Sequence, residues 1–255
     1  MILKYIIPLL YTHKYNRKGL DGLAYFLEYY AFILIFTYLR SYSIVECLIV
    51  FILLLAYMSI YEVGYIENNV FSIEKDISPT IRHSEDEILF LRKNYTTIFL
   101  YRYFISIIIV FALYFYIDTF FFLVLLVLTR IVFYGYNFVY RTGIENRILF
   151  SLLRFLRFFS PIYLLGFVSF VVVLPIVLVN FINNYAWYDR TSFTLSRFFG
   201  TKLFDSISYL LFFFIFSNLG FGNISYIFIY LSIIKFFLFL IVLAKRYRLN
   251  ISHFF

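Results

Sequence analysis

The sequence predicts an all-α membrane protein, in which a bundle of about eight transmembrane helices forms a single domain over residues 1–255. Three observations predict this class. Of the 255 residues, 64% are hydrophobic and only 14% are charged, whereas soluble domains are about half apolar and about one quarter charged. The mean hydropathy is +0.89. The apolar residues also form runs long enough to cross a bilayer, and the basic residues gather between alternate runs.

Eight apolar runs carry the prediction of transmembrane helices. A helix needs about 20 mostly apolar residues to cross a hydrocarbon core of roughly 30 Å. The runs that approach this length are 23–40, 44–65, 98–117, 119–140, 146–160, 161–182, 204–220 and 223–244. The fifth run is short and meets the sixth at Pro161. Because proline disfavours the continuation of a regular helix, we expect a tight turn at Ser160-Pro161.

The basic residues predict the orientation of the bundle. With eight crossings, Arg40 is the one basic residue on the outer side, and the other loops and both termini share the inner side. Arg102 is counted with the basic residues of the inner loop before the third run. Both termini are therefore expected to be cytoplasmic, with inner polar loops at about 66–97, 141–147 and 183–203. If run 146–160 lay flat on the surface instead, Arg190 would fall outside and break this pattern. A bacterial inner membrane fits such a protein, and an organellar membrane is the alternative.

Several other classes of protein do not fit this sequence. The net charge of +8 does not indicate a nucleic-acid partner, because the basic residues lie at the ends of apolar runs. Cys47 is the single cysteine, so neither a disulfide framework nor a cysteine metal site is available. His13, His83 and His253 lack the spacing of metal ligands and are expected to be structural. The N-terminal segment has no small-residue cleavage site, so we expect no removable signal peptide.

The inner end of the second run is rich in carboxylates and amides. If its helix continues to Asp76, then Glu62, Asn69 and Asp76 are spaced by seven and lie along one face. Glu67 and Glu74 form a second stripe. Oxygen ligands of this kind suit Mg²⁺, which usually takes one or two carboxylates together with substrate phosphates. The alternative is a solvated helix end whose acids balance the neighbouring lysines and arginines.

This stretch resembles a motif of the UbiA-type superfamily of integral membrane prenyltransferases. In that family the second helix ends in Asn-Asp-x-x-Asp-x-x-x-Asp, followed shortly by an Arg. The sequence Asn-Asn-Val-Phe-Ser-Ile-Glu-Lys-Asp over residues 68–76 matches it at Asn68 and Asp76, and Arg82 stands near the basic position. Asn69 and Ser72 replace the two middle aspartates. The order of spans and inner loops is also similar along most of the chain.

The second acidic motif of the family belongs in the loop after the sixth helix, where Asp189 is the only acidic residue between 180 and 190. The resemblance implies that two polar loops bracket a diphosphate through Mg²⁺ while a hydrophobic tunnel receives a polyprenyl chain. It implies catalytic roles for Asp76 and Asp189. The metal ligands would be Asn68, Asn69, Asp76 and Asp189, and the residues that hold phosphate would include Arg82, Arg141 and Arg147.

Four cations inside the predicted spans give a separate indication of anion binding: Arg130, Arg154, Arg157 and Lys235. A charge at the centre of a bilayer costs at least about 2.5 kcal/mol and normally faces a polar cavity. The alternative for Arg154 and Arg157 is that they reach toward the interface. Arg130 is too far inside its span for this, so we expect it to bind phosphate.

The sequence therefore predicts a Mg²⁺-dependent membrane transferase that joins a group from a diphosphate donor to a polyprenyl lipid. The favoured reaction moves phosphoribosyl from phosphoribosyl diphosphate to polyprenyl phosphate, because two anionic substrates suit the buried cations. A prenyltransferase that uses a prenyl diphosphate and a small aromatic acceptor is one alternative. A transporter or a structural subunit without catalysis is another. Membrane lipids are expected partners, and nucleic acid is not.

Overall fold

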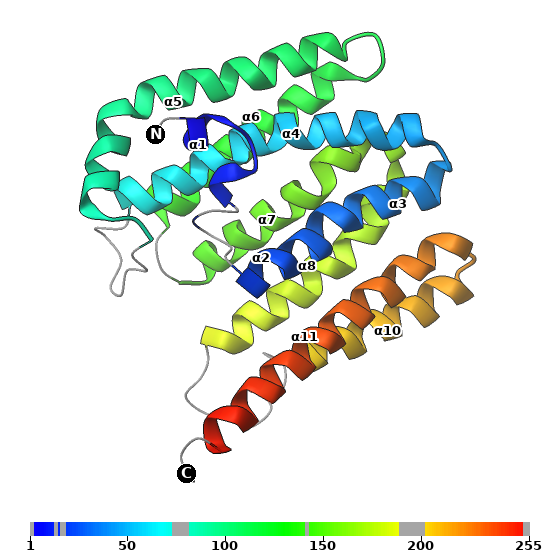
Figure 1. Ribbon diagram of the computed structural model, residues 1–255. Coiled ribbons are helices and arrows are strands. Elements are labelled where there is room, and N and C mark those ends of the chain that lie inside the picture. The colour runs from blue at the N-terminus through cyan, green and yellow to red at the C-terminus, as the bar shows by residue number, and fades with distance from the viewer. Residues whose placement is uncertain are drawn as a thin grey trace.

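The computed structural model describes residues 3–12, 15, 19–72, 82–140, 143–188 and 202–251, and its regular structure in these ranges is entirely helical. Most of these residues form four antiparallel helical hairpins (Figure 1). A short N-terminal helix, α1 (Leu3–Ile6), lies against the outside of α4 and α5. The all-α class predicted from the sequence is confirmed.

Each hairpin joins two long helical segments by a short turn. In the first hairpin, α2 (Gly19–Tyr25), the π-helical η2 (Phe26–Ala31) and α3 (Phe32–Ser41) lead to α4 (Ile44–Glu67), which η3 (Asn68–Ser72) extends. The second joins α5 (Glu85–Ala112) to α6 (Thr119–Tyr134) and its extension η5 (Gly135–Val139), and both helices pack against α4. The third pairs α7 (Gly143–Ile162) with α8 (Phe167–Tyr188) through η6 (Tyr163–Leu165). The fourth pairs α10 (Lys202–Asn218) with α11 (Tyr226–Ile251) through η7 (Gly222–Ser225).

Six helical segments are long and apolar enough to cross a membrane, which indicates an integral membrane protein. They are Gly22–Ser41, Ile44–Ser72, Glu85–Ala112, Thr119–Val139, Gly143–Leu165 and Gly222–Leu243. The apolar stretch Phe167–Asn183 of α8 is shorter, and α10 has 17 residues. Eight crossings therefore stay a prediction.

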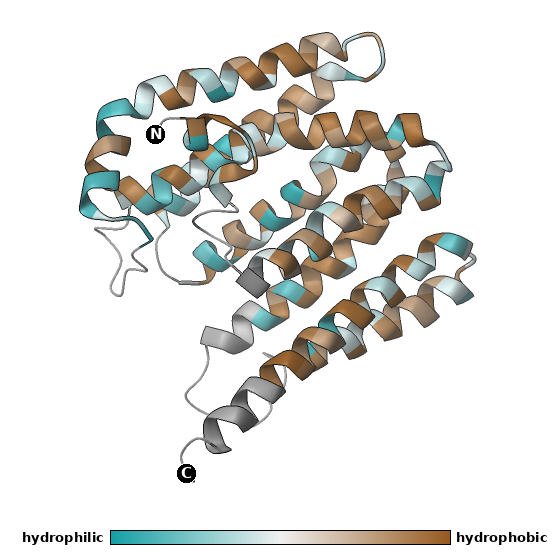
Figure 2. Ribbon diagram, in the orientation of Figure 1, coloured by the Kyte–Doolittle hydropathy of each residue, from teal (hydrophilic) through white to brown (hydrophobic). Residues whose placement is uncertain are grey.

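The two ends of the bundle differ in polarity. The four short hairpin turns lie at one end, whereas the first residues of α2, α5, α7 and α10 and the last residues of η3, η5, α8 and α11 lie at the other (Figure 1). We call the latter the loop end. Hydrophilic residues concentrate toward the loop end of α4 and α5, while the middle of the helices is hydrophobic (Figure 2). This arrangement matches the uneven distribution of charge along the sequence.

Side-chain caps fix where three of the helices begin. The Ser43 hydroxyl accepts a hydrogen bond from the Glu46 amide at 3.3 Å, and the Ser84 hydroxyl accepts one from the Glu87 amide at 3.3 Å. The Asp118 carboxylate accepts from the Phe121 amide at 3.1 Å. Such caps satisfy amides that have no partner inside the helix. They separate α3 from α4 and α5 from α6 and so define two of the turns.

The turn between α7 and α8 lies slightly later than the sequence indicates. Helix α7 continues through Pro161 to Ile162, so the proline occupies its last turn. The chain reverses at Gly166, whose φ of +72° is a conformation that glycine adopts more readily than other residues. The expected turn is present, but Gly166 ends it rather than Ser160-Pro161.

The inner loop expected at 66–97 is helical in part. Helix α5 starts at Glu85, so the second half of the loop expected at 66–97 is helical. Arg102, which we grouped with the basic residues of this loop, is fully buried within the bundle. The capping sequence Ser-Glu-Asp-Glu at 84–87 starts the helix well before the apolar run, because polar residues form helix as readily as apolar ones.

A buried ion pair between α4 and α5 holds the N-terminal segment. The Arg102 Nη1 donates to Glu62 Oε2 at 2.8 Å, and neither side chain is exposed. The same carboxylate accepts hydrogen bonds from the backbone amides of Leu9 at 3.1 Å and Thr12 at 2.7 Å. The Arg102 Nε donates to the Tyr5 carbonyl at 2.5 Å. Glu62 is therefore occupied by structural contacts and is not free to bind a ligand.

We predict that Arg102→Met lowers the free energy of unfolding by about 3–5 kcal/mol, because it leaves the Glu62 carboxylate buried without its cation. The double variant Glu62→Gln with Arg102→Met should lose less, since a neutral amide replaces the unpaired charge. Unfolding in mixed detergent micelles, followed by helical circular dichroism, measures both. Equal losses in the single and double variants would contradict the assigned pair.

A close contact between α4 and α6 sets the separation of these helices. A Cβ added to Gly64 would lie 2.3 Å from Cγ of Phe133, so the phenyl ring occupies the space that any side chain at this position needs. Both residues are buried. The glycine therefore allows the two helices to approach.

We predict that Gly64→Ala destabilises the protein by about 1–3 kcal/mol, because overpacking forces the Phe133 ring or a helix to move. Combining it with Phe133→Ala should cost less than the sum of the two single changes, since the smaller side chain makes room for the methyl group. The same unfolding assay measures the three variants. Additive losses would show that the two residues do not meet.

Candidate functional site

Two cavities among the described helices have the same two arginines in their lining. The first, which we call the lysine cavity, has a volume of about 230 Å³. Its polar and aromatic lining consists of Tyr25, Glu28, Tyr29, Arg154, Arg157, Phe158, Asn180, Lys202 and Lys235, and its apolar lining consists of Ala24, Leu238, Ile241 and Val242. The cavity is thus enclosed by α2 with η2, α7, α8, α10 and α11.

The second cavity, which we call the motif cavity, has a volume of about 250 Å³. Its lining consists of Tyr61, Tyr65, Asn68, Arg82, Phe133, Tyr136, Phe150, Leu153, Arg154 and Arg157. Asn68 and Arg82 come from the stretch in which the sequence predicted a phosphate and metal site. Three of the lining residues are arginines, and no acidic residue is among those that the structure places around this cavity.

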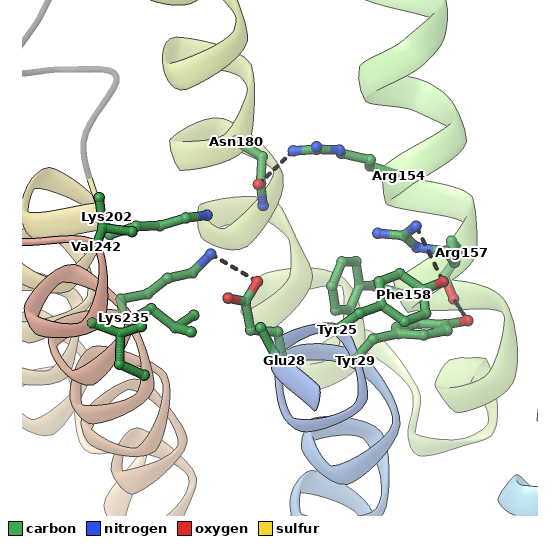
Figure 3. A pocket seen from close by; sticks show the side chains of 13 residues that line it. Tyr25, Glu28, Tyr29, Arg154, Arg157, Phe158, Asn180, Lys202, Lys235 and Val242 are labelled. Carbon is green, nitrogen blue, oxygen red and sulfur yellow. Dashed lines mark hydrogen bonds and ion pairs between the residues drawn. The ribbon is translucent and has the colours of Figure 1, made fainter. Parts of the chain in front are cut away.

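Two lysines extend side by side into the lysine cavity from the α10–α11 hairpin (Figure 3). The Lys235 ammonium is 2.7 Å from Glu28 Oε2 on η2 and 3.2 Å from Asp205 Oδ2 on α10. Lys202 is half-exposed and lies 4.0 Å from the same Asp205 oxygen. Lys235 therefore joins the hairpin to the remaining helices, while Lys202 has only a long contact with a carboxylate.

The fourth hairpin also makes neutral polar contacts that fix its position beside the cavity. The hydroxyls of Ser206 and Ser232 are 3.0 Å apart, and each donates to the backbone carbonyl of the other residue. The Tyr230 hydroxyl donates to the Leu27 carbonyl of η2 at 2.8 Å. The Asn183 amide of α8 donates to Asp205. These bonds hold α10 against α11 and the hairpin against its neighbours.

Arg154 and Arg157 stand one turn apart on α7 and separate the two cavities. The Arg154 guanidinium donates to the Asn180 carboxamide oxygen on α8 (Figure 3). Arg157 is 7% exposed. Its Nη1 lies 3.4 Å from the hydroxyl of Tyr25, in the lysine cavity, and 3.4 Å from that of Tyr65, in the motif cavity. Arg157 thus links the linings of the two cavities.

Aromatic rings surround Arg157 and hold it without a carboxylate. The guanidinium carbon lies 4.9 Å from the ring centre of Tyr29, 5.1 Å from that of Tyr25 and 5.4 Å from that of Phe158. Aromatic faces attract a cation, but they do not neutralise its charge. The Arg157 Nε is buried and has no hydrogen-bond partner among the described residues. Positive charge therefore remains at the boundary between the cavities.

All three π-helical extensions contribute lining residues. Glu28 and Tyr29 come from η2, Asn68 from η3 and Tyr136 from η5. Short π-helical segments inside α-helices are rare and occur frequently at functional sites. Here they turn polar side chains from three different helices toward the two cavities.

The structure brings together only some of the site residues predicted from the sequence. Asn68 and Arg82 line the motif cavity. Asn69 is buried beside them, where its carboxamide oxygen accepts from Arg82 at 2.8 Å and its amide donates to the Tyr11 hydroxyl at 2.8 Å. Asp76, Arg141 and Asp189 lie outside the described residues.

Arg130 and Arg147 do not line either cavity. Arg130 donates to Glu67 Oε1 at 2.6 Å, and the Tyr95 hydroxyl donates to the same oxygen. Arg130 therefore has a carboxylate partner in this structure. Arg147 is half-buried near the start of α7.

Sequence reasoning did not identify Glu28, Asp205 or Lys202 as parts of a site. Glu28 is an acidic residue inside an apolar run, and an ionisable group in a membrane span is itself an indication of function. Asp205 stands near the start of the seventh run, so the same rule identifies it less clearly. Lys202 was assigned to an inner loop, and this assignment gave no indication that it lies beside Lys235.

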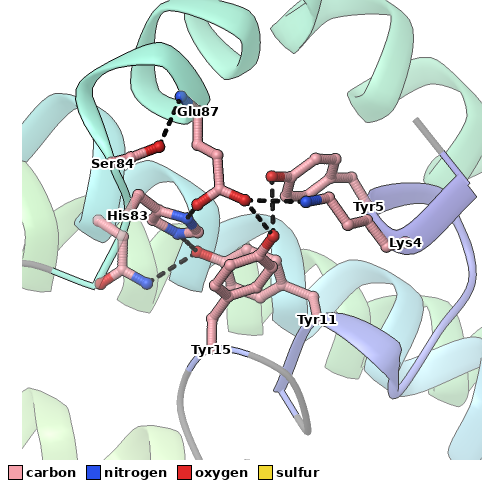
Figure 4. A network of polar contacts seen from close by, with 8 residues as sticks. Lys4, Tyr5, Tyr11, Tyr15, His83, Ser84 and Glu87 are labelled. Atoms are coloured by element: carbon pink, nitrogen blue, oxygen red, sulfur yellow. Dashed lines mark hydrogen bonds and ion pairs between the residues drawn. The ribbon is translucent and has the colours of Figure 1, made fainter. Parts of the chain in front are cut away.

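A polar network connects the motif cavity to the N-terminal segment (Figure 4). The Tyr11 hydroxyl, which accepts from Asn69, is 2.9 Å from Nε2 of His83. The His83 Nδ1 lies 3.5 Å from Glu87 Oε2, and the other Glu87 oxygen accepts from Lys4 at 2.9 Å and Tyr15 at 2.8 Å. This network fixes the position of Asn69, which in turn holds Arg82 at the rim of the motif cavity.

The described lining of the motif cavity suits an anion better than an isolated metal ion. It provides three guanidinium groups but only one amide, from Asn68, whose oxygen already accepts from the Ser72 hydroxyl at 2.8 Å. Within the described ranges, no three His, Cys, Asp or Glu side chains are grouped as metal ligands. Mg²⁺ prefers carboxylate and phosphate oxygens. A metal site here would depend on Asp76, Asp189 and the phosphates of a bound substrate.

Comparison of the chain with family models, with curated proteins and with solved structures gives no match.

The polar network predicts a dependence of stability on pH. Burial lowers the pKa of His83 below its usual range, although the neighbouring Glu87 opposes this shift. The unfolded chain therefore takes up a proton on His83 at a higher pH than the folded protein does. Stability should be complete above about pH 6.5 and should fall as the pH decreases below this value.

Thermal unfolding between pH 8 and 5 tests this prediction, with His83→Gln as the comparison. We expect the variant to show a smaller decrease in melting temperature over this range, because its amide does not titrate. The same decrease in both proteins would show that His83 is not responsible.

Proposed function

We propose that this protein is a Mg²⁺-dependent membrane transferase that joins a group from a diphosphate donor to a polyprenyl lipid. The pair of substrates that fits best is phosphoribosyl diphosphate and polyprenyl phosphate. One observation carries the proposal: Asn68 and Arg82, which match the family motif in the sequence, share a cavity with the half-buried Arg154 and the buried Arg157. The UbiA-like resemblance was based on the sequence motif and on the order of spans and inner loops, and the position of these arginines is an independent support for it.

The chemistry of the motif cavity supports a diphosphate as its ligand. Guanidinium groups form paired, charge-assisted hydrogen bonds with phosphate oxygens. Arg82 approaches the cavity from the segment before α5, and Arg154 and Arg157 approach it from α7, so one diphosphate can contact more than one of them. In a group transfer, the charge on the departing diphosphate increases. Cations fixed in a poorly solvated cavity stabilise this charge more strongly than they would in water.

Mg²⁺ belongs to this proposal through Asp76 and Asp189, the two carboxylates that the family motifs indicate. When bound, the metal would neutralise charge on the diphosphate. The described residues would act on the phosphate oxygens themselves. Asn69 would position Arg82, because its carboxamide oxygen accepts the Arg82 hydrogen bond.

The aromatic wall of the motif cavity favours a second candidate, transfer of a prenyl group to a small aromatic acceptor. Five aromatic side chains line this cavity: Tyr61, Tyr65, Phe133, Tyr136 and Phe150. A flat ring could stack on them. We favour phosphoribosyl transfer because the lysine cavity adds a second cationic surface, which a neutral acceptor does not require.

We also propose that the loop end faces the cytoplasm of a bacterial cell, with both termini on that side. The basic loops of the sequence support this orientation through the positive-inside rule. In this orientation a soluble diphosphate reaches the motif cavity from the cytoplasm, because Arg82 stands at the loop end before α5.

We predict that Arg82→Ala lowers transfer from phosphoribosyl diphosphate to polyprenyl phosphate on the order of 100-fold, because one cation that holds the diphosphate is lost. The measurement uses purified protein with Mg²⁺ and radiolabelled donor, and it follows label in the lipid phase. Lys93→Ala is the matched control, since Lys93 is exposed on α5 and lines neither cavity. It should leave the rate unchanged.

A parallel assay supplies a prenyl diphosphate with a small aromatic acceptor. Turnover in that assay, without any phosphoribosyl transfer, would reverse the order of the two candidates. If folded protein turns over neither pair, or if Arg82→Ala retains the full rate, the proposed use of the motif cavity is wrong.

A further inference from the structure

We propose that the lysine cavity binds the phosphate headgroup of a lipid, whose hydrocarbon chain leaves the cavity across α11. This inference rests on the proposed function only in naming the lipid as a substrate. The binding itself follows from the charge, the apolar side and the size of the cavity.

Charge is the first argument. Among the described residues, the cavity is lined by four basic side chains (Arg154, Arg157, Lys202 and Lys235) and one acidic side chain, Glu28. Asp205 lies behind the lysines, 3.2 Å from Lys235. Four cations thus face two carboxylates; Arg157 and Lys235 are buried, Arg154 is half-buried and Lys202 is half-exposed. A buried excess of positive charge is costly unless an anion compensates it.

The Arg157 side chain shows where an anion is most needed. It is more than nine-tenths buried, and neutral groups surround it. Its Nε has no partner within the described part of the chain. A phosphate oxygen is the strong acceptor that such a donor lacks. Lys202 stands across the cavity with a half-exposed ammonium group, so it can contact the same phosphate from the other side.

The apolar side of the cavity distinguishes a lipid from a soluble anion. Leu238, Ile241 and Val242 of α11 form this side. Val242 is 58% exposed, and Phe237, on the same helix, is 59% exposed. These residues lie in a helix that can cross the membrane, so their exposed faces would meet lipid chains. A phosphate attached to a hydrocarbon chain can therefore enter beside α11 without the chain leaving the apolar layer.

Size supports a headgroup rather than a whole ligand. A volume of about 230 Å³ is below the roughly 300–1,000 Å³ of pockets that enclose entire small molecules. The cavity is large enough for a phosphate, whereas a long chain must extend outside it. Because Arg154 and Arg157 also line the motif cavity, the bound headgroup would lie next to the diphosphate donor.

Lipid binding to purified protein tests this inference without turnover. The probes are undecaprenyl phosphate, undecaprenol and inorganic phosphate, each titrated in nanodiscs of neutral lipid and followed by native mass spectrometry or thermal stabilisation. We expect tight binding of undecaprenyl phosphate alone. Lys202→Ala should weaken this binding about 10-fold, and Arg157→Gln should weaken it on the order of 100-fold. Lys93→Ala should not alter it.

Two variants, Lys202→Ala and Arg157→Gln, are measured so that a folding defect in one of them does not decide the test. The ion pair of Lys202 with Asp205 is long, and its side chain is half-exposed, so its alanine variant should fold like the wild type. Wild-type affinity in both variants would overturn the assignment of the headgroup to this cavity. Inorganic phosphate that binds as tightly as the lipid would overturn the lipid as its source. Intact lipid binding without phosphoribosyl transfer would instead contradict the proposed function and leave this inference standing.

Discussion

A charge buried between membrane-spanning helices needs a partner, and this constraint organises most of the described structure. Glu62 neutralises Arg102 and, through its second oxygen, holds the N-terminal segment against α4. Glu67 pairs with Arg130 between α4 and α6. Lys235 meets Glu28 and Asp205 and joins the last hairpin to the other helices. Each pair links two different helical elements. Removing one partner would therefore leave the other charge buried without compensation and would also loosen the contact between the two elements.

Arg157 is the exception, because aromatic side chains rather than a carboxylate surround it. A ring of aromatic side chains stabilises its charge without cancelling it. Arg154 and Arg157 are one turn apart on α7, so a single helix presents positive charge to both cavities. A site that handles two phosphate-bearing molecules needs this kind of shared surface, because the two reacting groups must come close while their negative charges are balanced.

The sequence predicted the helical class and the positions of most long apolar helices, because the length of an apolar run is a local property. It also indicated Asn68 and Arg82 through the motif stretch, and Arg154, Arg157 and Lys235 because ionisable groups in apolar runs are rare. It misplaced Arg102, whose helix starts in polar sequence through a cap that no hydropathy pattern records. It did not predict that Lys202 and Lys235 lie side by side, or that aromatic side chains surround Arg157. Those depend on how α10 and α11 pack against η2 and α7, and this packing is a long-range property that residue spacing does not encode.

The most direct test of this account is the distance between Arg157 and a bound phosphate. Solid-state NMR can measure the dipolar coupling between nitrogen-labelled arginine side chains and the phosphorus of undecaprenyl phosphate, in protein reconstituted in neutral bilayers. We expect strong coupling in the wild type and a clear reduction in Arg157→Lys, which keeps the charge but removes the labelled guanidinium. The absence of coupling in the wild type, with the lipid bound, would contradict the assignment of this arginine to phosphate recognition.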